Sequence, residues 1–178
     1  SAGISGYSGK SGMTCTTCHL GRVTGPDWTL AGPATLAAGE TATYTLNMKG
    51  GPGKVAGADI AVSDAAAMLT AGTGLKVLSG ELVHDGPQPF VNGEVTFTFK
   101  VKAPATEGMF TVYVAANSAN GDGNNTLDSI ISTKRDVTVT PAVAEEKGGC
   151  AAAGGAPVWM FALLAAGVGL RRMRVAGR

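Results

Sequence analysis

The sequence predicts an all-β protein: a two-sheet sandwich of immunoglobulin-like size, with an irregular leader before it and an apolar helix after it. Residues 27–141 alternate between apolar and polar side chains in short runs that are broken by Gly, Pro and Asn. Residues 1–26 are rich in Gly and Ser, and residues 151–170 carry no charge. We therefore divide the chain into a leader (1–26), a sandwich (27–141), a spacer with a cysteine (142–150), a transmembrane helix (151–170) and a basic tip (171–178).

The leader is expected to be a loop. Its stretch from Ser5 to Gly12 offers little apolar surface, so it becomes ordered only by packing on another group. The chain begins at Ser1 and not at a methionine, and we expect a mature chain whose export signal has been removed.

The sandwich is predicted from strands with a period of two. Residues 41–48 place Ala42, Tyr44, Leu46 and Met48 on one face, and residues 95–102 do the same with Val95, Phe97, Phe99 and Val101. Further strands are predicted over 58–62, 75–78, 109–116 and 136–140, and one short helical turn over 63–69.

The leader contains the run Cys15-Thr16-Thr17-Cys18-His19, which is the attachment pattern of a c-type haem. Two thiols with two residues between them can each form a thioether with one vinyl group of the haem. The adjacent imidazole then reaches the iron from the same side. We expect one covalent haem here, with His19 as an iron ligand.

Two other chemistries could use the same cysteines. A C-x-x-C pair can be a redox disulfide, but such pairs open a helix in a βαβ setting that this sequence lacks. Zinc needs four ligands, which Cys15, Cys18, His19 and His84 would supply in number. Ligands on consecutive residues make poor tetrahedral geometry, so haem is favoured over zinc.

The sixth position of the iron has several candidate ligands. His84 is the other histidine of the chain, at an expected strand end beside a turn. Three methionines, Met48, Met68 and Met109, are alternatives, although core packing is their more ordinary role. A position without a protein ligand would instead allow gas binding and sensing.

An oxygen-rich loop follows the strand at 109–116. It runs from Asn117 to Asn125 and is followed by Asp128. Calcium accepts such ligands, but the spacing does not match an EF-hand, so we favour a turn whose Asn and Asp side chains bond their own backbone. This loop could also cover a haem edge.

Several function classes are not supported by the sequence. It shows no Ser/His/Asp triad in a recognisable context and no phosphate-binding loop after a strand, so we expect no enzyme beyond an electron carrier. Four of the 14 basic residues, all arginines, lie in the last eight positions, which leaves residues 1–150 with a net charge of about −3. Nucleic acid is therefore not an expected partner.

The C-terminal segment is expected to cross a membrane. A helix over 151–170 would span about 30 Å, the thickness of a bilayer core. The arginines from Arg171 onward should stay cytoplasmic, which places the sandwich outside the cell or in the periplasm.

This tail resembles a MYXO-CTERM sorting signal. The matching features are Gly148-Gly149-Cys150, the apolar stretch through Leu170 and the arginine cluster from Arg171. The resemblance implies a sorting protease as partner, removal of the helix near Cys150 and lipid attachment at that cysteine.

The body resembles the choice-of-anchor, Reelin-like group of bacterial surface domains. The matching residues are Ser8 to Gly12 with the C-x-x-C-H run, Leu82-Val83-His84, Phe97-Thr98-Phe99 with Ala103-Pro104, and Val114 to Gly123. The resemblance implies a β-sandwich displayed at the cell surface, and it supplies no reaction.

Together these features predict an exported, anchored monohaem cytochrome that exchanges single electrons with a redox partner protein. Two alternatives stay open: a surface or adhesion domain in which haem or metal is only structural, and a haem-based sensor.

Overall fold

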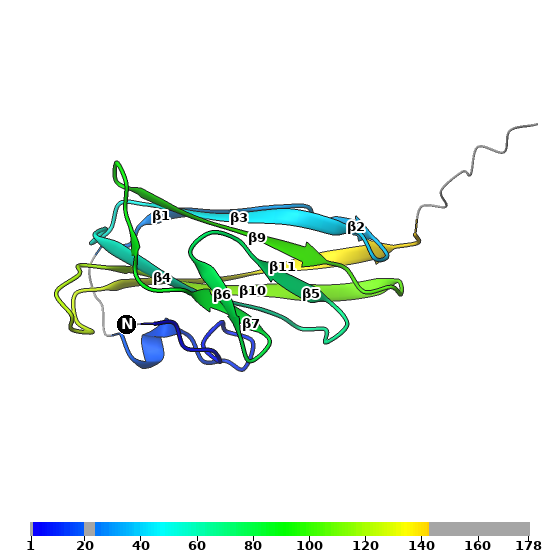
Figure 1. Ribbon diagram of the computed structural model, residues 1–178, viewed down its shortest axis with the longest axis horizontal. Helices are drawn as coiled ribbons and strands as arrows, with labels where there is room; N and C mark the ends of the chain where they lie inside the picture. Colours follow the sequence, from blue (N-terminus) through cyan, green and yellow to red (C-terminus); the bar gives the residue numbers. More distant parts are fainter. Residues whose placement is uncertain (1, 20–23, 143–178) are drawn as a thin grey trace, which may run out of the picture. The chain divides into compact units, whose positions relative to one another are not determined.

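The chain folds as an all-β sandwich of two sheets, and the computed structural model describes residues 2–19 and 24–142 (Figure 1). A short 3₁₀ turn, η1 (Cys15–Thr17), precedes the strands. The strands are β1 (Asp27–Ala31), β2 (Thr35–Ala37), β3 (Thr41–Lys49), β4 (Val55–Val62), β5 (Met68–Ala71), β6 (Leu75–Leu78), β7 (Glu81–His84), β8 (Gln88–Pro89), β9 (Glu94–Lys102), β10 (Gly108–Ala119) and β11 (Ser129–Thr140).

The two sheets differ in size. The smaller has the order β1-β3-β9-β5, and the larger has the order β2-β11-β10-β4-β7-β6, with β8 paired to β4. All pairs are antiparallel except β2 with β11, which makes the larger sheet mixed.

The core lies between the sheets and confirms the predicted alternation. Tyr44, Leu46 and Met48 of β3 are buried, as is every second residue of β9 from Val95 to Val101. Because apolar surface leaves water on both inner faces, this burial is the main force that holds the layers together.

One arginine links the two sheets, and one glycine makes room for a core tyrosine. Arg135 of β11 donates from Nη1 to the Gly32 carbonyl and from Nη2 to the Leu30 carbonyl, each at 2.6 Å. Gly32 has a φ of +148°, and a β-carbon there would lie 2.2 Å from Cδ1 of Tyr44. The Tyr44 ring stacks on Phe99, with ring centroids 5.8 Å apart.

The leader packs on the outer face of the larger sheet, opposite the core, as Figure 1 shows for the dark blue segment below β4 and β6 and beside β7. The Gly3 amide donates to the His84 carbonyl at 3.1 Å. The Glu81 carboxylate accepts from the Gly6 amide and, at 3.3 Å, from the Ser8 hydroxyl. The expected loop therefore gains its order from the sheet, through backbone groups that bond to strand residues.

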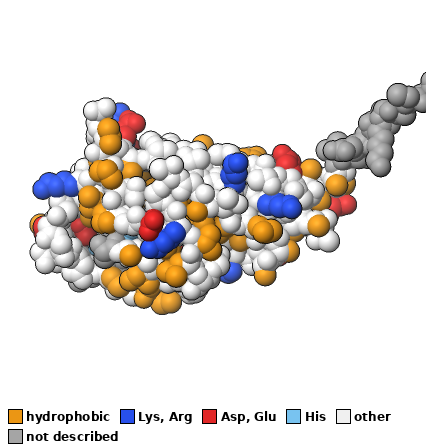
Figure 2. Space-filling model, viewed as in Figure 1, with side chains coloured by type: hydrophobic (Ala, Val, Ile, Leu, Met, Phe, Trp, Pro, Cys, Tyr) orange, Lys and Arg blue, Asp and Glu red, His pale blue; other side chains and the backbone are white. Residues whose placement is uncertain are grey.

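Figure 2 shows the face that carries β6 and the leader. Hydrophobic side chains gather along its lower edge, and the Lys and Arg side chains stand apart from one another. The large exposed hydrophobic residues include Ile4 in the leader and Val77 and Leu78 in β6.

One secondary-structure prediction was wrong. Residues 63–69 form no helical turn: Asp64 accepts from the Ala66 amide through its side chain and from the Ala67 amide through its carbonyl, and β5 begins at Met68. Asp64 thus closes a tight turn that leads directly into a strand.

The C-terminal predictions fall outside the described residues. These are the sorting cysteine Cys150, the transmembrane helix 151–170 and the basic tip 171–178. Within residues 2–19 and 24–142, no helix has the length and apolar character needed to cross a membrane.

Candidate functional site

The C-x-x-C-H run is folded into a single turn, η1. Thr14 caps the turn by accepting from the Thr16 amide through Oγ1, and the amides of Cys18 and His19 donate to the Cys15 carbonyl at 3.3 and 2.9 Å. A turn of this kind brings the two thiols and the imidazole close together in space. All three residues line one pocket.

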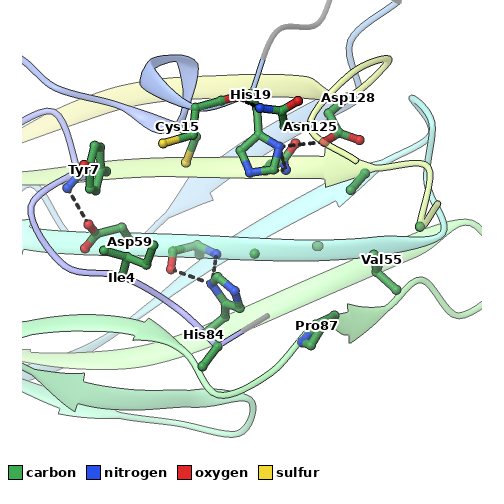
Figure 3. A pocket seen from close by; sticks show the side chains of 18 of the residues that line it. Ile4, Tyr7, Cys15, His19, Val55, Asp59, His84, Pro87, Asn125 and Asp128 are labelled. Atoms are coloured by element: carbon green, nitrogen blue, oxygen red, sulfur yellow. Dashed lines mark hydrogen bonds and ion pairs between the residues drawn. The ribbon is translucent and has the colours of Figure 1, made fainter. Parts of the chain in front are cut away.

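His84 lines the same pocket, from the opposite side. The pocket has a volume of about 740 Å³, within the range of about 300–1,000 Å³ that is typical of ligand-binding cavities. Figure 3 shows the rings of His19 and His84 projecting into it from two sides, with the Cys15 sulfur on the side of His19. Strand β4 supplies the wall between them through residues 55–59.

The His84 ring is held by the backbone of β4. Its Nδ1 lies 3.2 Å from the Ala58 amide nitrogen and 3.3 Å from the Ala58 carbonyl oxygen. The ring also packs over Gly57, where a β-carbon would lie 2.7 Å from Cε1. Glycine at this position therefore makes room for the ring at the pocket wall. His84 is the last residue of β7, as predicted, and it is half-buried.

His19 is held by the connection between β10 and β11. Its Nδ1 lies 2.6 Å from Oδ2 of Asp128, a fully buried carboxylate. The side-chain Nδ2 of Asn117 lies 3.0 Å from Nδ1 and 3.4 Å from Nε2 of the same ring. Asn125 donates to the Cys18 carbonyl at 2.7 Å. The oxygen-rich loop thus contacts the C-x-x-C-H run directly.

Both cysteines of the run are thiols that form no disulfide in the described part of the chain. Burial raises the pKa of Cys15 to about 12, and the nearby Asp59 carboxylate adds to the shift. Catalytic and metal-binding cysteines need a lowered pKa, because the thiolate is the reactive form. The environment of Cys15 therefore disfavours the thiolate as long as no metal is bound to the sulfur. It keeps the sulfur as a neutral thiol in the pocket.

Asp59 is a pocket residue that belongs to no recognisable motif in the sequence. It is buried on β4, and burial raises its pKa to about 7, with the Glu81 carboxylate contributing further. The Tyr7 amide donates to Oδ2 at 2.7 Å and so ties the leader to the pocket. Only the three-dimensional pairing of leader and β4 reveals this residue.

The residues around the pocket fit a covalently attached haem. Two thiols and an imidazole lie on one turn, a second imidazole lies across the pocket, and Ile4, Val55 and Pro87 add apolar surface. Two buried oxygens of lining residues, Asp59 Oδ1 and Asn117 Oδ1, accept no hydrogen bond from the described residues. A bound group or an ordered water would supply donors to them.

The methionine alternatives lie elsewhere. Met48 is in the core, and Met68 and Met109 are exposed; none of these three lines the pocket. Across residues 2–19 and 24–142, no group of three or more His, Cys, Asp or Glu side chains is arranged to hold a metal ion.

The oxygen-rich loop bonds largely to itself. Asp122 accepts from the Asn124 amide at 2.8 Å and from the Asn120 side chain at 3.1 Å. The Asn124 amide lowers the pKa of Asp122. Asp122 therefore bonds the backbone two residues further along the chain. Such a turn is what the sequence favours over a calcium site.

No family model matches the chain, and no curated protein matches it. Among solved structures, the chain is similar to the CARDB domain of a protein from Pyrococcus furiosus, which was crystallised in complex with di-metal ions. The identity is 19%, the TM-score is 0.35, and the match covers 68% of this chain and 94% of that chain.

Proposed function

We propose that this protein is an anchored monohaem c-type cytochrome that transfers single electrons. Cys15 and Cys18 attach the haem, and His19 and His84 ligate its iron. The observation that carries the proposal is that these four residues, from the leader and from β7, line one pocket. The C-x-x-C-H run contains only three of these residues. The fourth, His84, lines the pocket because of the fold.

When bound, the haem supplies a reversible one-electron couple at its iron. The protein's part is to hold and shield it. The two thiols add across the vinyl groups and prevent loss of the cofactor. The half-buried His84, steadied at Nδ1 by Ala58, presents its ring from the far wall. Apolar residues such as Ile4 and Val55 exclude water from part of the pocket.

The leader's contacts favour electron transfer over a purely structural haem. The leader is already bonded to the sheet through Gly3 with His84 and through Tyr7 with Asp59. A haem is therefore not needed to fasten the leader in place.

We also propose that the protein is anchored outside the cytoplasm. The tail from Cys150 onward carries the order of cysteine, apolar span and arginines that suits sorting, lipid attachment and anchoring outside the cytoplasm. A sorting protease is the partner for that step, and the sandwich is of the Reelin-like, immunoglobulin-like kind.

The test is haem attachment. The full chain is produced in a host with haem-maturation machinery, denatured, separated on a gel and stained for haem peroxidase activity. We expect a stained band for the native chain and none for the variant with both Cys15→Ala and Cys18→Ala. A colourless native chain from that host would overturn the proposal.

A further inference from the structure

Asp128 forms the shortest polar contact that the C-x-x-C-H run makes with the described residues. The separation of 2.6 Å between His19 Nδ1 and Asp128 Oδ2 is short for a nitrogen–oxygen pair, as charge-assisted hydrogen bonds are. An ionised Asp128 only accepts, which assigns the His19 proton to Nδ1; the Asn117 Nδ2 group can then donate only to Nε2, at 3.4 Å. The lone pair is then on Nε2, the nitrogen that would ligate the iron of a haem held by Cys15 and Cys18.

The carboxylate itself is held in place. Asp128 is fully buried, and its other oxygen accepts from the Asn120 amide at 3.1 Å. It immediately precedes β11, and Asn125 of the same loop donates to the Cys18 carbonyl. The loop therefore contacts the C-x-x-C-H run at two points, the His19 ring and the Cys18 backbone carbonyl. A buried, bonded carboxylate has little freedom to turn away from the imidazole.

A carboxylate behind an iron-ligating histidine has a known electronic effect. It fixes the tautomer and the ring orientation, and it makes the ligating nitrogen more electron-rich. The more electron-rich ligand stabilises the ferric state, which carries one positive charge more than the ferrous state. Taking up one electron at the iron then becomes less favourable, so the midpoint potential falls.

We infer that Asp128 is the positioning residue of this site: it accepts the Nδ1–H of His19, aims Nε2 at the iron and holds the midpoint potential low. This inference rests on the proposed function. It implies a partner that donates or accepts electrons at low potential.

The experiment measures the midpoint potential of the haem-loaded full chain by spectroelectrochemistry. We expect the potential to rise in Asp128→Asn, where the acceptor is neutral, and to rise further in Asp128→Ala, where it is gone. Asp122→Asn is the matched control, because it removes the same charge from the same loop without touching His19. We expect no comparable shift in this control.

A second measurement does not depend on the variants folding. In the reduced native protein, labelled with ¹⁵N-histidine, the His19 Nδ1 proton should resonate far downfield and exchange slowly with water. A haem-loaded Asp128→Asn protein with the native potential would overturn the inference alone, as would a rapidly exchanging Nδ1 proton. A colourless native chain would overturn the proposed function as well, so the two failures are distinct.

Discussion

The imidazole of His84 lies against Gly57 of the neighbouring strand β4, at a place where a β-carbon would come within 2.7 Å of Cε1 and 2.9 Å of Nδ1. A methyl group in that position cannot coexist with the ring as it stands. The position of one pocket histidine therefore depends on the absence of a side chain on the adjacent strand.

Gly57→Ala should displace His84 and weaken its bond to the haem iron. We expect a visible spectrum of mixed low-spin and high-spin character, and a loss of about 1–3 kcal/mol in the free energy of unfolding, typical of overpacking. A double-mutant cycle provides the control: in a His84→Ala background, Gly57→Ala should change the spectrum no further. A fully low-spin Gly57→Ala protein would mean that the ring's position is not needed for ligation.

His84→Ala should abolish the low-spin spectrum, because the sixth ligand is lost. Added imidazole should restore it by entering the space vacated by the ring. Met109→Ala is the control, since Met109 is exposed and lies outside the pocket. An unchanged low-spin spectrum in His84→Ala would eliminate this histidine as ligand.

The stability of the haem-free chain should fall as the pH rises through Asp59's titration. The pKa of Asp59 is raised in the folded protein from 3.8 to about 7. The folded state then binds more protons than the unfolded state between these values, so stability is fully present below pH 3.8 and is lost towards pH 7.

Asp59→Asn tests this pH dependence because it removes the buried charge and keeps an acceptor for the Tyr7 amide. We expect the variant to melt on the order of 5 °C above the native chain at pH 8, and close to it at pH 4.5. Asp27→Asn, at an exposed position of β1, is the matched control. An equal difference in melting temperature at both pH values would contradict the expectation.

Gly32→Ala should be among the most damaging single-methyl changes in the sandwich. A β-carbon there would lie 2.2 Å from the Tyr44 ring, which is fully buried against Phe99. Gly39→Ala is the control, because Gly39 also has a positive φ but open space around it. Urea unfolding should show an extra cost of about 1–3 kcal/mol for Gly32→Ala over the control. Equal costs would mean that Tyr44 can move aside freely.

Strands β3 and β9 were predictable because their burial alternates on one side only. From Val95 to Val101, each apolar residue faces the core and each residue between them faces water. Strand β2 was missed because it has three residues and is defined by its parallel pairing with β11, which no local pattern records. The first residues of β4, Val55 to Gly57, were missed because alanine and glycine give no strand signal.

The site was predictable only in part. The C-x-x-C-H spacing is by itself typical of haem attachment, so Cys15, Cys18 and His19 could be named as candidate site residues from the sequence. That His84 lines the same pocket depends on the leader docking against β7, a contact between residues distant in the chain. Asp128 was noticed only as part of an oxygen-rich loop that could bind calcium or cover a haem edge, because its bond to His19 exists only after folding.

The leader docks on the outside of the larger sheet and contributes nothing to the interior: in the described chain, the residues of the hydrophobic core begin at Leu30. The core between the sheets is therefore complete without the leader, whereas the outer face depends on it: Gly3 lies against Val83, which is fully buried yet stands outside that core. Substitutions in the leader should leave the inner face packed and should expose the outer face around Val83 to water.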